Sequence, residues 1–522
     1  DMRTFISIIL SIFTCTQLYS QAGELDLSFG VDGFIITELG ESFDGITSMA
    51  IQEDGKIVAV GYSYGATHSD FGIARYNIDG SLDNTFSLDG KLVFDFDTTF
   101  SIPYSVVVQA DNKIVVGGYA TLNDTSIADC FALARLNADG SLDDGFGDGG
   151  IIKLYIGTTH LDIIYSLQIQ PDGKILAAGT SYSDHHGRFV VTRFNSDGTL
   201  DNSFSGDGIT TTDIYDDTEV IFSITRQSDG KILAGGYTFK DGIPEYALVR
   251  YNENGDIDES FGDDGIVVIS IGTDFDLITS VIIQPDNKII ASGYSSDFDS
   301  DTDISIARFN PDGSLDYSFS GDGTLRTDIA EDDHSWQSLI QPDGKIITAG
   351  QSKQDGFAKM AIVRYNPDGS MDTTFGIEGI IELEIDTLQS IASSIILGPD
   401  GKLLVGGSAG SDPDNDFCLV KILTDIEVGI LDFNQANQII IYPNPTKEYV
   451  KLSFTLKQSE NISLSLINMD GSLVKNYMQN VSYNPGICNE FLHLPSEIAS
   501  GIYYLLIETE NAKVSIAINI QH

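Results

Sequence analysis

The sequence predicts an all-β protein, a seven-bladed β-propeller followed by a small immunoglobulin-like β-sandwich. Three observations carry this prediction. One hairpin phrase, typified by Gln170-Pro171-Asp172-Gly173-Lys174-Ile175, recurs seven times. Each repeat contains four short stretches rich in β-branched residues and bounded by Gly, Asp and Asn. After Leu423 the repeat stops, and a different series of alternating strands runs to residue 522.

The hairpin lysine gives the repeat length. It stands at Lys56, Lys113, Lys174, Lys231, Lys288, Lys345 and Lys402, so copies are 57 residues apart, or 61 for one pair. One four-stranded unit cannot bury both faces of its sheet, so neighbouring units must pack on each other. The predicted organisation is a signal peptide at 1–22, the propeller at 23–423, a linker at 424–437 and a C-terminal domain at 438–522.

The predicted signal peptide has a positive end at Met2-Arg3, an apolar run at 5–13 and a plausible cleavage region at 18–22. The run is too short to cross a bilayer, which takes about 20 apolar residues, and no other run approaches that length. The sequence therefore predicts a secreted protein without a transmembrane segment.

Within one repeat, the elements follow a fixed order. A connector at 82–86 precedes a first strand at 90–96, a second at 101–109, a third at 113–119 and a fourth at 131–137. Tight turns rich in Asp, Asn and Gly follow the second and fourth strands. The sequence period need not equal the blade. In one arrangement the first strand, 33–39, completes the last blade beside 417–423 and leaves no exposed edge; unpermuted blades are the alternative.

Residues present in every repeat are predicted to be architectural. The fourth strand carries Arg75, Arg135, Arg193, Arg250, Arg308, Arg364 and, in the last copy, Lys421. The Leu-Asp-x-x-Phe connector carries Asp26, Asp83, Asp143, Asp201, Asp258, Asp316 and Asp372. We expect a charge-assisted Arg–Asp pair in each blade. The connector Phe should pack between blades, and the hairpin lysine should be solvated.

The turn after the fourth strand is rich in oxygen ligands. Candidate calcium ligands are Asn77, Asp79, Asp83, Asn310, Asp312 and Asp316, because calcium prefers such oxygen clusters. The spacing is not that of an EF-hand loop, and Asn and Asp also cap turns in which Gly takes a positive φ. The prediction is therefore turn chemistry and no resident cofactor, with calcium as the alternative.

Positions that differ between repeats are the better ligand candidates. Nine residues before the hairpin lysine stand Thr47, Tyr104, Tyr165, Phe222, Thr279, Trp336 and Ser393. If the second strand lines the central channel, these side chains lie near one rim, beside acidic loops containing Asp274, Asp276, Asp332 and Asp333. Aromatic faces beside carboxylates suit sugar rings or cations. Tyr104, Tyr165, Phe222 and Trp336 are the predicted ligand-binding residues; interblade packing is the alternative.

Composition excludes several classes. The chain has 77 acidic and 28 basic residues, a net charge of −49, which argues against nucleic acid or anionic lipid as a partner. No C-x-x-C pair occurs, so Cys130, Cys418 and Cys488 are predicted to be free, buried thiols. His160 and His334 are expected in loops before second strands and His185-His186 in a third-to-fourth-strand loop, and no metal site is predicted from them. No motif of a catalytic nucleophile, phosphate loop or zinc protease appears.

Two stretches resemble known families. Arg308-Phe309-Asn310-Pro311-Asp312-Gly313-Ser314-Leu315-Asp316, with Gln284-Pro285-Asp286-Asn287-Lys288-Ile289, is similar to the delta-60 repeat of bacterial surface and secreted proteins, over residues 25–423. Tyr442-Pro443-Asn444-Pro445, Asp470-Gly471 and Ser500-Gly501-Ile502-Tyr503-Tyr504 resemble the type A C-terminal sorting domain of type IX secretion in Bacteroidetes, over 438–522. The second resemblance implies the type IX machinery as a partner, export across the outer membrane, and release or surface attachment.

The functional expectation is a secreted or cell-surface, non-catalytic propeller that binds a glycan or a protein, as in adhesion. The alternatives are an extracellular polysaccharide-acting hydrolase or lyase on a propeller scaffold, and a structural matrix component. The first alternative needs an asymmetric cluster of acids or histidines at one mouth of the channel, whereas binding needs an aromatic or shaped patch without one.

Overall fold

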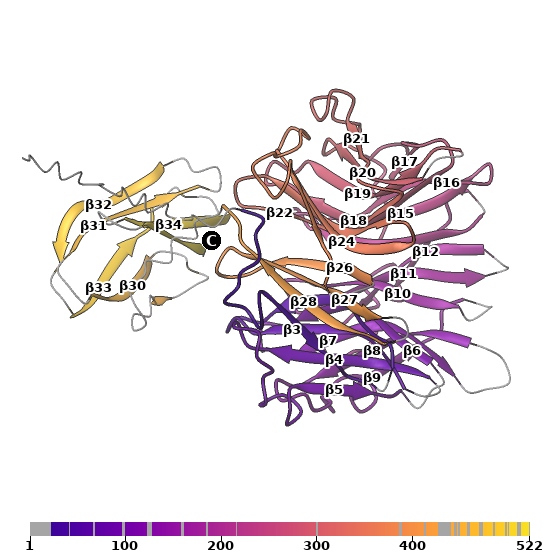
Figure 1. Ribbon diagram of the computed structural model, residues 1–522, viewed down its shortest axis with the longest axis horizontal. Helices are drawn as coiled ribbons and strands as arrows, with labels where there is room; N and C mark the ends of the chain where they lie inside the picture. The colour runs from indigo at the N-terminus through magenta and orange to yellow at the C-terminus, as the bar shows by residue number, and fades with distance from the viewer. Residues whose placement is uncertain are drawn as a thin grey trace, which may run out of the picture.

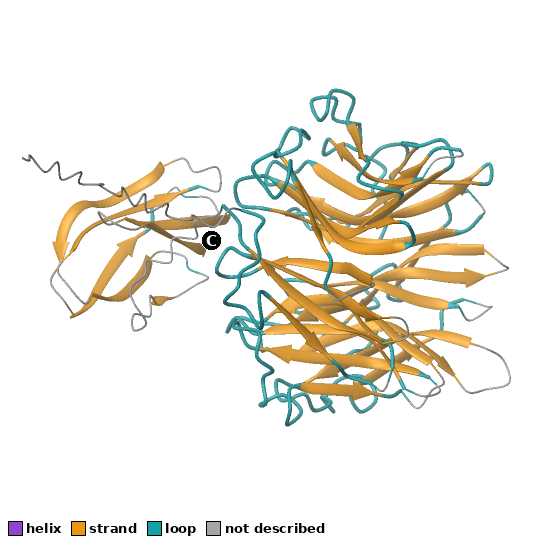
Figure 2. Cartoon of the chain, viewed as in Figure 1, coloured by secondary structure: helices purple, strands orange, loops and turns teal. Residues whose placement is uncertain are grey.

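The computed structural model describes residues 22–425 and 440–520, each with short gaps in loops. The predicted signal peptide apart from Ala22, and most of the predicted linker, lie outside the described residues. Across the described ranges, strands and loops make up the chain without a helix (Figure 2). Accordingly, this part of the chain contains no helix with the length and apolar character needed to cross a membrane.

The strands of the first part form seven four-stranded antiparallel sheets (Figure 1). The first three blades contain β2 (Asp44–Ile51), β3 (Ile57–Tyr64), β4 (Ser69–Tyr76) and β5 (Lys91–Phe94); β6 (Phe100–Val108), β7 (Ile114–Leu122), β8 (Ala128–Leu136) and β9 (Ile151–Leu154); and β10 (Asp162–Ile169), β11 (Ile175–Ser183), β12 (His186–Phe194) and β13 (Ile209–Thr212). Blades four and five contain β14 (Glu219–Arg226), β15 (Ile232–Lys240), β16 (Ile243–Tyr251) and β17 (Ile266–Ile269); and β18 (Phe275–Ile283), β19 (Ile289–Ser296), β20 (Thr302–Phe309) and β21 (Thr324–Thr327). Blade six contains β22 (Asp332–Ile340), β23 (Ile346–Gln354), β24 (Phe357–Tyr365) and β25 (Ile380–Leu383).

The seventh blade joins both ends of the propeller. It contains β26 (Gln389–Leu397), β27 (Leu403–Ser411), β28 (Asp414–Ile422) and the first strand of the chain, β1 (Phe34–Thr37). Phe34 pairs with Val420 and Thr37 with Phe417 in antiparallel register. The permuted closure is therefore confirmed, and it covers the edge of β28 that would otherwise be open to pairing.

The hydrophobic core lies between neighbouring blades. One cluster, for example, joins Val58 and Ile73 of the first blade to Val116 and Ala132 of the second, all fully buried or nearly so. Strands β3 and β4 and their equivalents are apolar almost throughout, because both sheet faces of a blade are covered by neighbours. Core packing thus makes each blade depend on the next, as predicted for a repeat array.

The predicted Arg–Asp pair exists in six blades. In five blades the arginine Nε donates to the connector aspartate at 2.6–2.8 Å, and in the sixth Arg364 Nε lies 2.7 Å from Asp372 as an ion pair. In all six the guanidinium lies 4.4–4.9 Å above the ring of the connector Phe. The same guanidinium reaches the next blade; Arg75, for instance, donates to the carbonyl of Ala138. In the closing blade Lys421 takes this place, above Phe29 and donating to the carbonyl of Ile78. We call this set the Arg–Asp–Phe seam.

The expectation of a solvated hairpin lysine is wrong. The seven lysine Nζ atoms lie 2.7–3.5 Å from the connector aspartates of the seam, and their side chains are 18–30 % exposed. Six of the seven aspartates therefore face two cations, while Asp26 pairs with Lys402. For Asp83, burial alone would raise the pKa, but hydrogen bonds from Thr85 and the charges of Arg75 and Lys56 lower it to about 2. The lysine recurs in every repeat because it balances the charge of a buried carboxylate.

The C-terminal part forms a separate body of two antiparallel sheets. One sheet contains β29 (Ile440–Tyr442), β30 (Tyr449–Leu456) and β33 (Gly486–His493), and the other β31 (Glu460–Ile467), β32 (Leu473–Tyr483), β34 (Gly501–Glu508) and β35 (Lys513–Ile520). Buried residues of both sheets, such as Leu452 and Leu464, share one core. This is a β-sandwich; an immunoglobulin-like topology stays a prediction.

Two cysteines behave as predicted. Cys130 and Cys418 are buried and free, and burial raises the pKa of the Cys130 thiol to about 11 and that of Cys418 to about 12. Both thiols are therefore protonated and unreactive at neutral pH. The side chain of Cys488 lies outside the described residues.

Candidate functional site: the bulge ring and its cavity

Seven strands surround the central channel. They are β2, β6, β10, β14, β18, β22 and β26, the first strand of each sheet, and each lies against its counterparts in the two neighbouring blades. Each carries a β-bulge at the same place, where its register with the next strand shifts by one residue. The bulged residues are Thr47, Tyr104, Tyr165, Phe222, Thr279, Trp336 and Ser393. We call these residues the bulge ring.

A glycine opposite each bulge makes it possible. A Cβ on Gly236, for example, would lie 1.7 Å from the carbonyl oxygen of Val220, and the seven equivalent values run from 1.7 to 2.0 Å. The glycines are Gly61, Gly118, Gly179, Gly236, Gly293, Gly350 and Gly407. Only a residue without a side chain allows the bulged strand to come this close. The extra residue then re-aims its side chain, which is a common use of bulges beside functional sites.

The residue after each bulge ties neighbouring blades together. Ser48 accepts a hydrogen bond from Val106 N at 3.3 Å, and the same bond repeats around the ring from Leu167, Ile224, Val281, Ser338 and Ile395. Met49 N donates to Ser394 Oγ at 3.1 Å and closes the circle. These bonds join the seven bulged strands into one ring, so the bulge-ring side chains project from a backbone that hydrogen bonds hold together.

The bulge ring encloses a cavity of about 290 Å³. Its lining consists of all seven bulged residues together with Gln351 and Ile391. The structure thus brings the four predicted ligand-binding residues, Tyr104, Tyr165, Phe222 and Trp336, into one site. The centroid of the Tyr165 ring lies 4.8 Å from those of both Tyr104 and Phe222, so three aromatic residues form a continuous wall. Burial raises the pKa of Tyr104 to about 12 and that of Tyr165 further, so both phenols stay uncharged.

The wall at blade six differs from the others. Trp336 lies edge-on to Tyr294, with centroids 5.9 Å apart, and His334 stacks on Tyr294 at 4.1 Å. His334 lies within β22, so its predicted place in a loop is wrong: β22 begins at Asp332, earlier than the apolar pattern indicates. His186 begins β12, while His160 and His185 lie outside the described residues.

The predicted acidic rim is partly wrong. Asp276 and Asp333 are buried rather than at a rim, and their carboxylates accept backbone N–H groups of the loop before each strand, Ile271 and Gly272 in one case and Ile329 and Ala330 in the other. Glu219 does the same in blade four, where burial raises its pKa to about 7. These acids hold loops in place, and among the described residues the cavity is lined by uncharged side chains alone.

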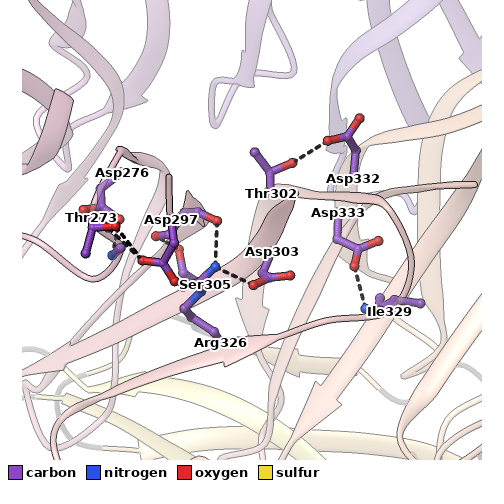
Figure 3. A network of polar contacts seen from close by, with 12 residues as sticks. Thr273, Asp276, Asp297, Thr302, Asp303, Ser305, Arg326, Ile329, Asp332 and Asp333 are labelled. Carbon is purple, nitrogen blue, oxygen red and sulfur yellow. Dashed lines mark hydrogen bonds and ion pairs between the residues drawn. The ribbon is translucent and has the colours of Figure 1, made fainter. Parts of the chain in front are cut away.

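One acidic cluster lies outside the cavity. Carboxylate oxygens of Asp303, Asp328 and Asp333 lie within 4.8 Å of one another. Arg326 donates to Asp303 and Asp297 at 2.5 and 2.6 Å, as Figure 3 shows. An arginine already neutralises part of this cluster, so its geometry suits an ion-pair network between blades five and six.

The calcium candidates all have partners within their own turns. Asp79 Oδ1 accepts from the amide and hydroxyl of Ser81, and Asn77 donates to the same hydroxyl. Asp83 binds Thr85 and Arg75. The second set, Asn310, Asp312 and Asp316, makes the same contacts with Ser314, Ser318 and Arg308. These contacts are those of capped turns that also meet the neighbouring blade.

Sequence reasoning missed two lining residues, Gln351 and Ile391. Gln351 follows the glycine that faces the bulge, and this position holds Tyr, Thr or Ser in the other blades. The signal that could have found it is the same as for the bulge ring: a fixed place in the repeat where residue types differ.

Comparisons with known proteins agree with the fold. Seven segments match the family described as a domain of unknown function (DUF5122) beta-propeller, at 52–86, 109–146, 170–204, 227–261, 284–319, 341–375 and 398–425. Residues 440–521 match the secretion system C-terminal sorting domain. No curated protein sequence matches this chain.

Several solved structures are similar to this chain at low sequence identity. A PL25 ulvan lyase bound to -[GlcA(1-4)Rha3S]- is 13 % identical, with a TM-score of 0.42, covering 74 % of this chain and 94 % of that one. Sqt1 from Chaetomium thermophilum is 10 % identical, with a TM-score of 0.39 and coverage of 74 % and 99 %. A protein of unknown function from Dyadobacter fermentans is 11 % identical, with a TM-score of 0.40 and coverage of 75 % and 98 %. At these values the likeness carries no functional argument.

Both sequence resemblances are confirmed, and the sorting domain indicates export to the extracellular space or the cell surface. The chain therefore belongs to the DUF5122 β-propeller family and carries the C-terminal sorting domain of type IX secretion.

Proposed function

We propose that the protein is a non-catalytic binding protein, released or held at the cell surface, whose bulge-ring cavity takes the end of a glycan. The observation that carries this proposal is the lining. The cavity is lined by the aromatic faces of Tyr104, Tyr165, Phe222 and Trp336 together with the neutral hydroxyls of Thr47, Thr279 and Ser393. A sugar ring offers apolar C–H groups on its face and hydroxyls at its edge, which match such a wall.

Size and charge narrow the ligand. A cavity of about 290 Å³ is at the lower end of the roughly 300–1,000 Å³ of ligand pockets. The cavity therefore suits one end of a glycan rather than a long internal stretch of it. A cation would also favour aromatic faces, but the lining residues that the structure describes include no carboxylate. The lining therefore favours a neutral sugar over a cation. Calcium at the turns stays a separate prediction, tested by the change in Tm on adding calcium after chelation.

A glycan array with the full chain, without its predicted signal peptide, tests the proposal. We expect binding that Trp336→Ala and Tyr165→Ala weaken at least tenfold. Tyr317→Ala is the matched control, because Tyr317 is an aromatic residue that is 71 % exposed in a connector. Array binding that Trp336→Ala leaves unchanged overturns the proposal.

An extracellular polysaccharide hydrolase or lyase is the second candidate, and His334 is the observation that favours it. It is a titratable residue beside the cavity wall in one blade alone. Both of its ring nitrogens have partners, Gln351 and Thr302, which suits a positioning role better than proton transfer to a substrate. Release of new reducing or unsaturated ends from a panel of polysaccharides supports the enzyme hypothesis. If no polysaccharide is cleaved and no glycan on the array binds, a protein ligand or a matrix component is favoured.

A further inference from the structure

One pair of facing residues breaks the sevenfold pattern beside the cavity. Two residues before each bulge stand Gly45, Ile102, Ile163, Val220, Leu277, His334 and Ile391. Six of them are glycine or apolar, and the exception, His334, faces Gln351 across the strand pair. Gln351 lines the cavity. The departure from symmetry therefore lies at the wall that a ligand would touch.

A chain of hydrogen bonds runs from this pair to the surface. Gln351 Nε2 lies 3.2 Å from His334 Nδ1, and His334 Nε2 lies 3.0 Å from Thr302 Oγ1. Thr302 Oγ1 lies 3.2 Å from Asp332 Oδ1, as Figure 3 shows. These residues come from β23, β22 and β20, so blades five and six hold the chain together.

The carboxylate at the end fixes the direction of every bond. Ionised Asp332 only accepts, so the single proton of the Thr302 hydroxyl goes to it. Thr302 must then accept from His334 Nε2–H, which leaves Nδ1 of a neutral imidazole as an acceptor. Gln351 must donate its amide N–H to that Nδ1. Its carbonyl Oε1 accepts no hydrogen bond from the described part of the chain.

The surroundings of His334 keep it neutral. Burial and the charge of Lys353 on β23 lower its pKa, and together they outweigh Asp332 on its own strand. Lys353 and Asp332 also pair with each other at 3.7 Å. The remaining contacts, Tyr294 and Thr302, are uncharged at neutral pH.

We propose that Gln351 is the specificity-determining residue of the cavity, held through His334, Thr302 and Asp332 so that its carbonyl selects a ligand hydroxyl at blade six. This inference rests on the proposed glycan-binding function. Protonation of His334 would place N–H groups on both ring nitrogens. Gln351 would then have to turn its carbonyl to Nδ1 and present its NH₂ group, so the preference for a donor reverses in acid.

The first test needs no ligand. Nitrogen-15 NMR of histidine-labelled full chain at pH 7.5 reports which ring nitrogen carries the proton. The His334 signal is assigned by its loss in His334→Phe, which keeps a ring for Tyr294 to stack on. We expect the Nε2–H tautomer, and a loss of that fixed state in Asp332→Asn, because an amide no longer sets the direction. A Nδ1–H tautomer or a charged ring overturns the inference.

The second test uses the best glycan from the array and its deoxy analogues. Wild type should bind one deoxy analogue about tenfold more weakly than the parent glycan. Gln351→Leu should bind the parent glycan as weakly as wild type binds that analogue, and should bind parent and analogue equally. Gln354→Leu, an exposed change on the same strand, is the matched control. Unchanged discrimination in Gln351→Leu overturns the specificity. If no glycan binds, both the proposed function and the selection of a ligand hydroxyl by Gln351 are overturned, whichever tautomer of His334 the NMR experiment shows.

Discussion

The Arg–Asp–Phe seam and the bulge ring are both sevenfold, but they repeat different things. The seam repeats residue types: aspartate in seven blades and arginine in six, and the six arginines each pair with the connector aspartate. The bulge ring repeats only backbone geometry, with a bulge and a facing glycine in each blade. Its side chains range from Ser393 to Trp336. Where a side chain joins blades, its chemistry is fixed; where it faces open space, it is free to differ.

The largest effect should come from breaking the seam. Arg193→Ala leaves Asp201 half-compensated by Lys174 and removes the contacts with Phe204 and the next blade. Removing one partner of a buried pair costs about 3 kcal/mol or more. Arg188→Ala, on the same strand, removes an ion pair whose side chains are 34 and 37 % exposed, and should cost about 0–1 kcal/mol. Urea denaturation measures both; equal losses would show that the seam is not a structural joint.

The second effect concerns the frame of the bulge ring. Gly61→Ala places a Cβ 1.8 Å from the carbonyl oxygen of Gly45, so the backbone must move. Overpacking of this kind costs about 1–3 kcal/mol. Gly65→Ala in the same blade meets nothing closer than 3.8 Å and should stay within about 1 kcal/mol of wild type. Thermal unfolding compares the two. A tolerated Gly61→Ala contradicts the role given to the facing glycine.

The third effect concerns the closure of the ring of hydrogen bonds. Ser394→Ala leaves the buried Met49 N–H without its acceptor, at a cost of about 1–2 kcal/mol. Ser81→Ala, in an exposed turn, is the control and should change stability by less than about 0.5 kcal/mol. Differential scanning calorimetry measures the unfolding temperatures of both variants. If the two variants unfold at the same temperature, the hydrogen bond from Met49 to Ser394 is not needed to close the ring.

The smallest effect depends on pH. The pKa of Glu219 is about 7, raised by burial above the 4.5 of an exposed glutamate. The folded protein therefore binds more protons than the unfolded chain between these values, and stability falls as pH rises from about 4.5 to 7. Glu219→Gln keeps an oxygen for Ile214 and Tyr215 and removes this dependence. We therefore expect the difference in Tm between Glu219→Gln and wild type to shift by about 2 °C in favour of the variant as the pH rises from 5 to 8. A constant difference in Tm across that range contradicts the shifted pKa.

Sequence alone predicted much of the fold because repetition makes architecture visible. The hairpin phrase set the blade count, and the pairing of the first strand, 33–39, with 417–423 was one of two predicted ways to close the ring. It also found the seven bulge-ring positions, since a fixed place with variable residue types stands out. It could not show the bulges, because a one-residue shift in register leaves the apolar pattern almost unchanged. It misjudged Asp333 and the hairpin lysines, because the burial of a charge depends on partners that only the folded chain brings into contact: loop amides for Asp333, and connector aspartates for the lysines.

Strand β28 lies inside its sheet, with β27 on one side and β1 on the other. Nine register pairs hold it to β27 and four hold it to β1. The chain leading to the sorting domain leaves from the end of this strand. A force applied at the C-terminal end of β28 and directed along the strand therefore loads two ladders of hydrogen bonds at once, in shear. The closure that completes the propeller therefore also divides between two neighbouring strands any load that is applied along β28.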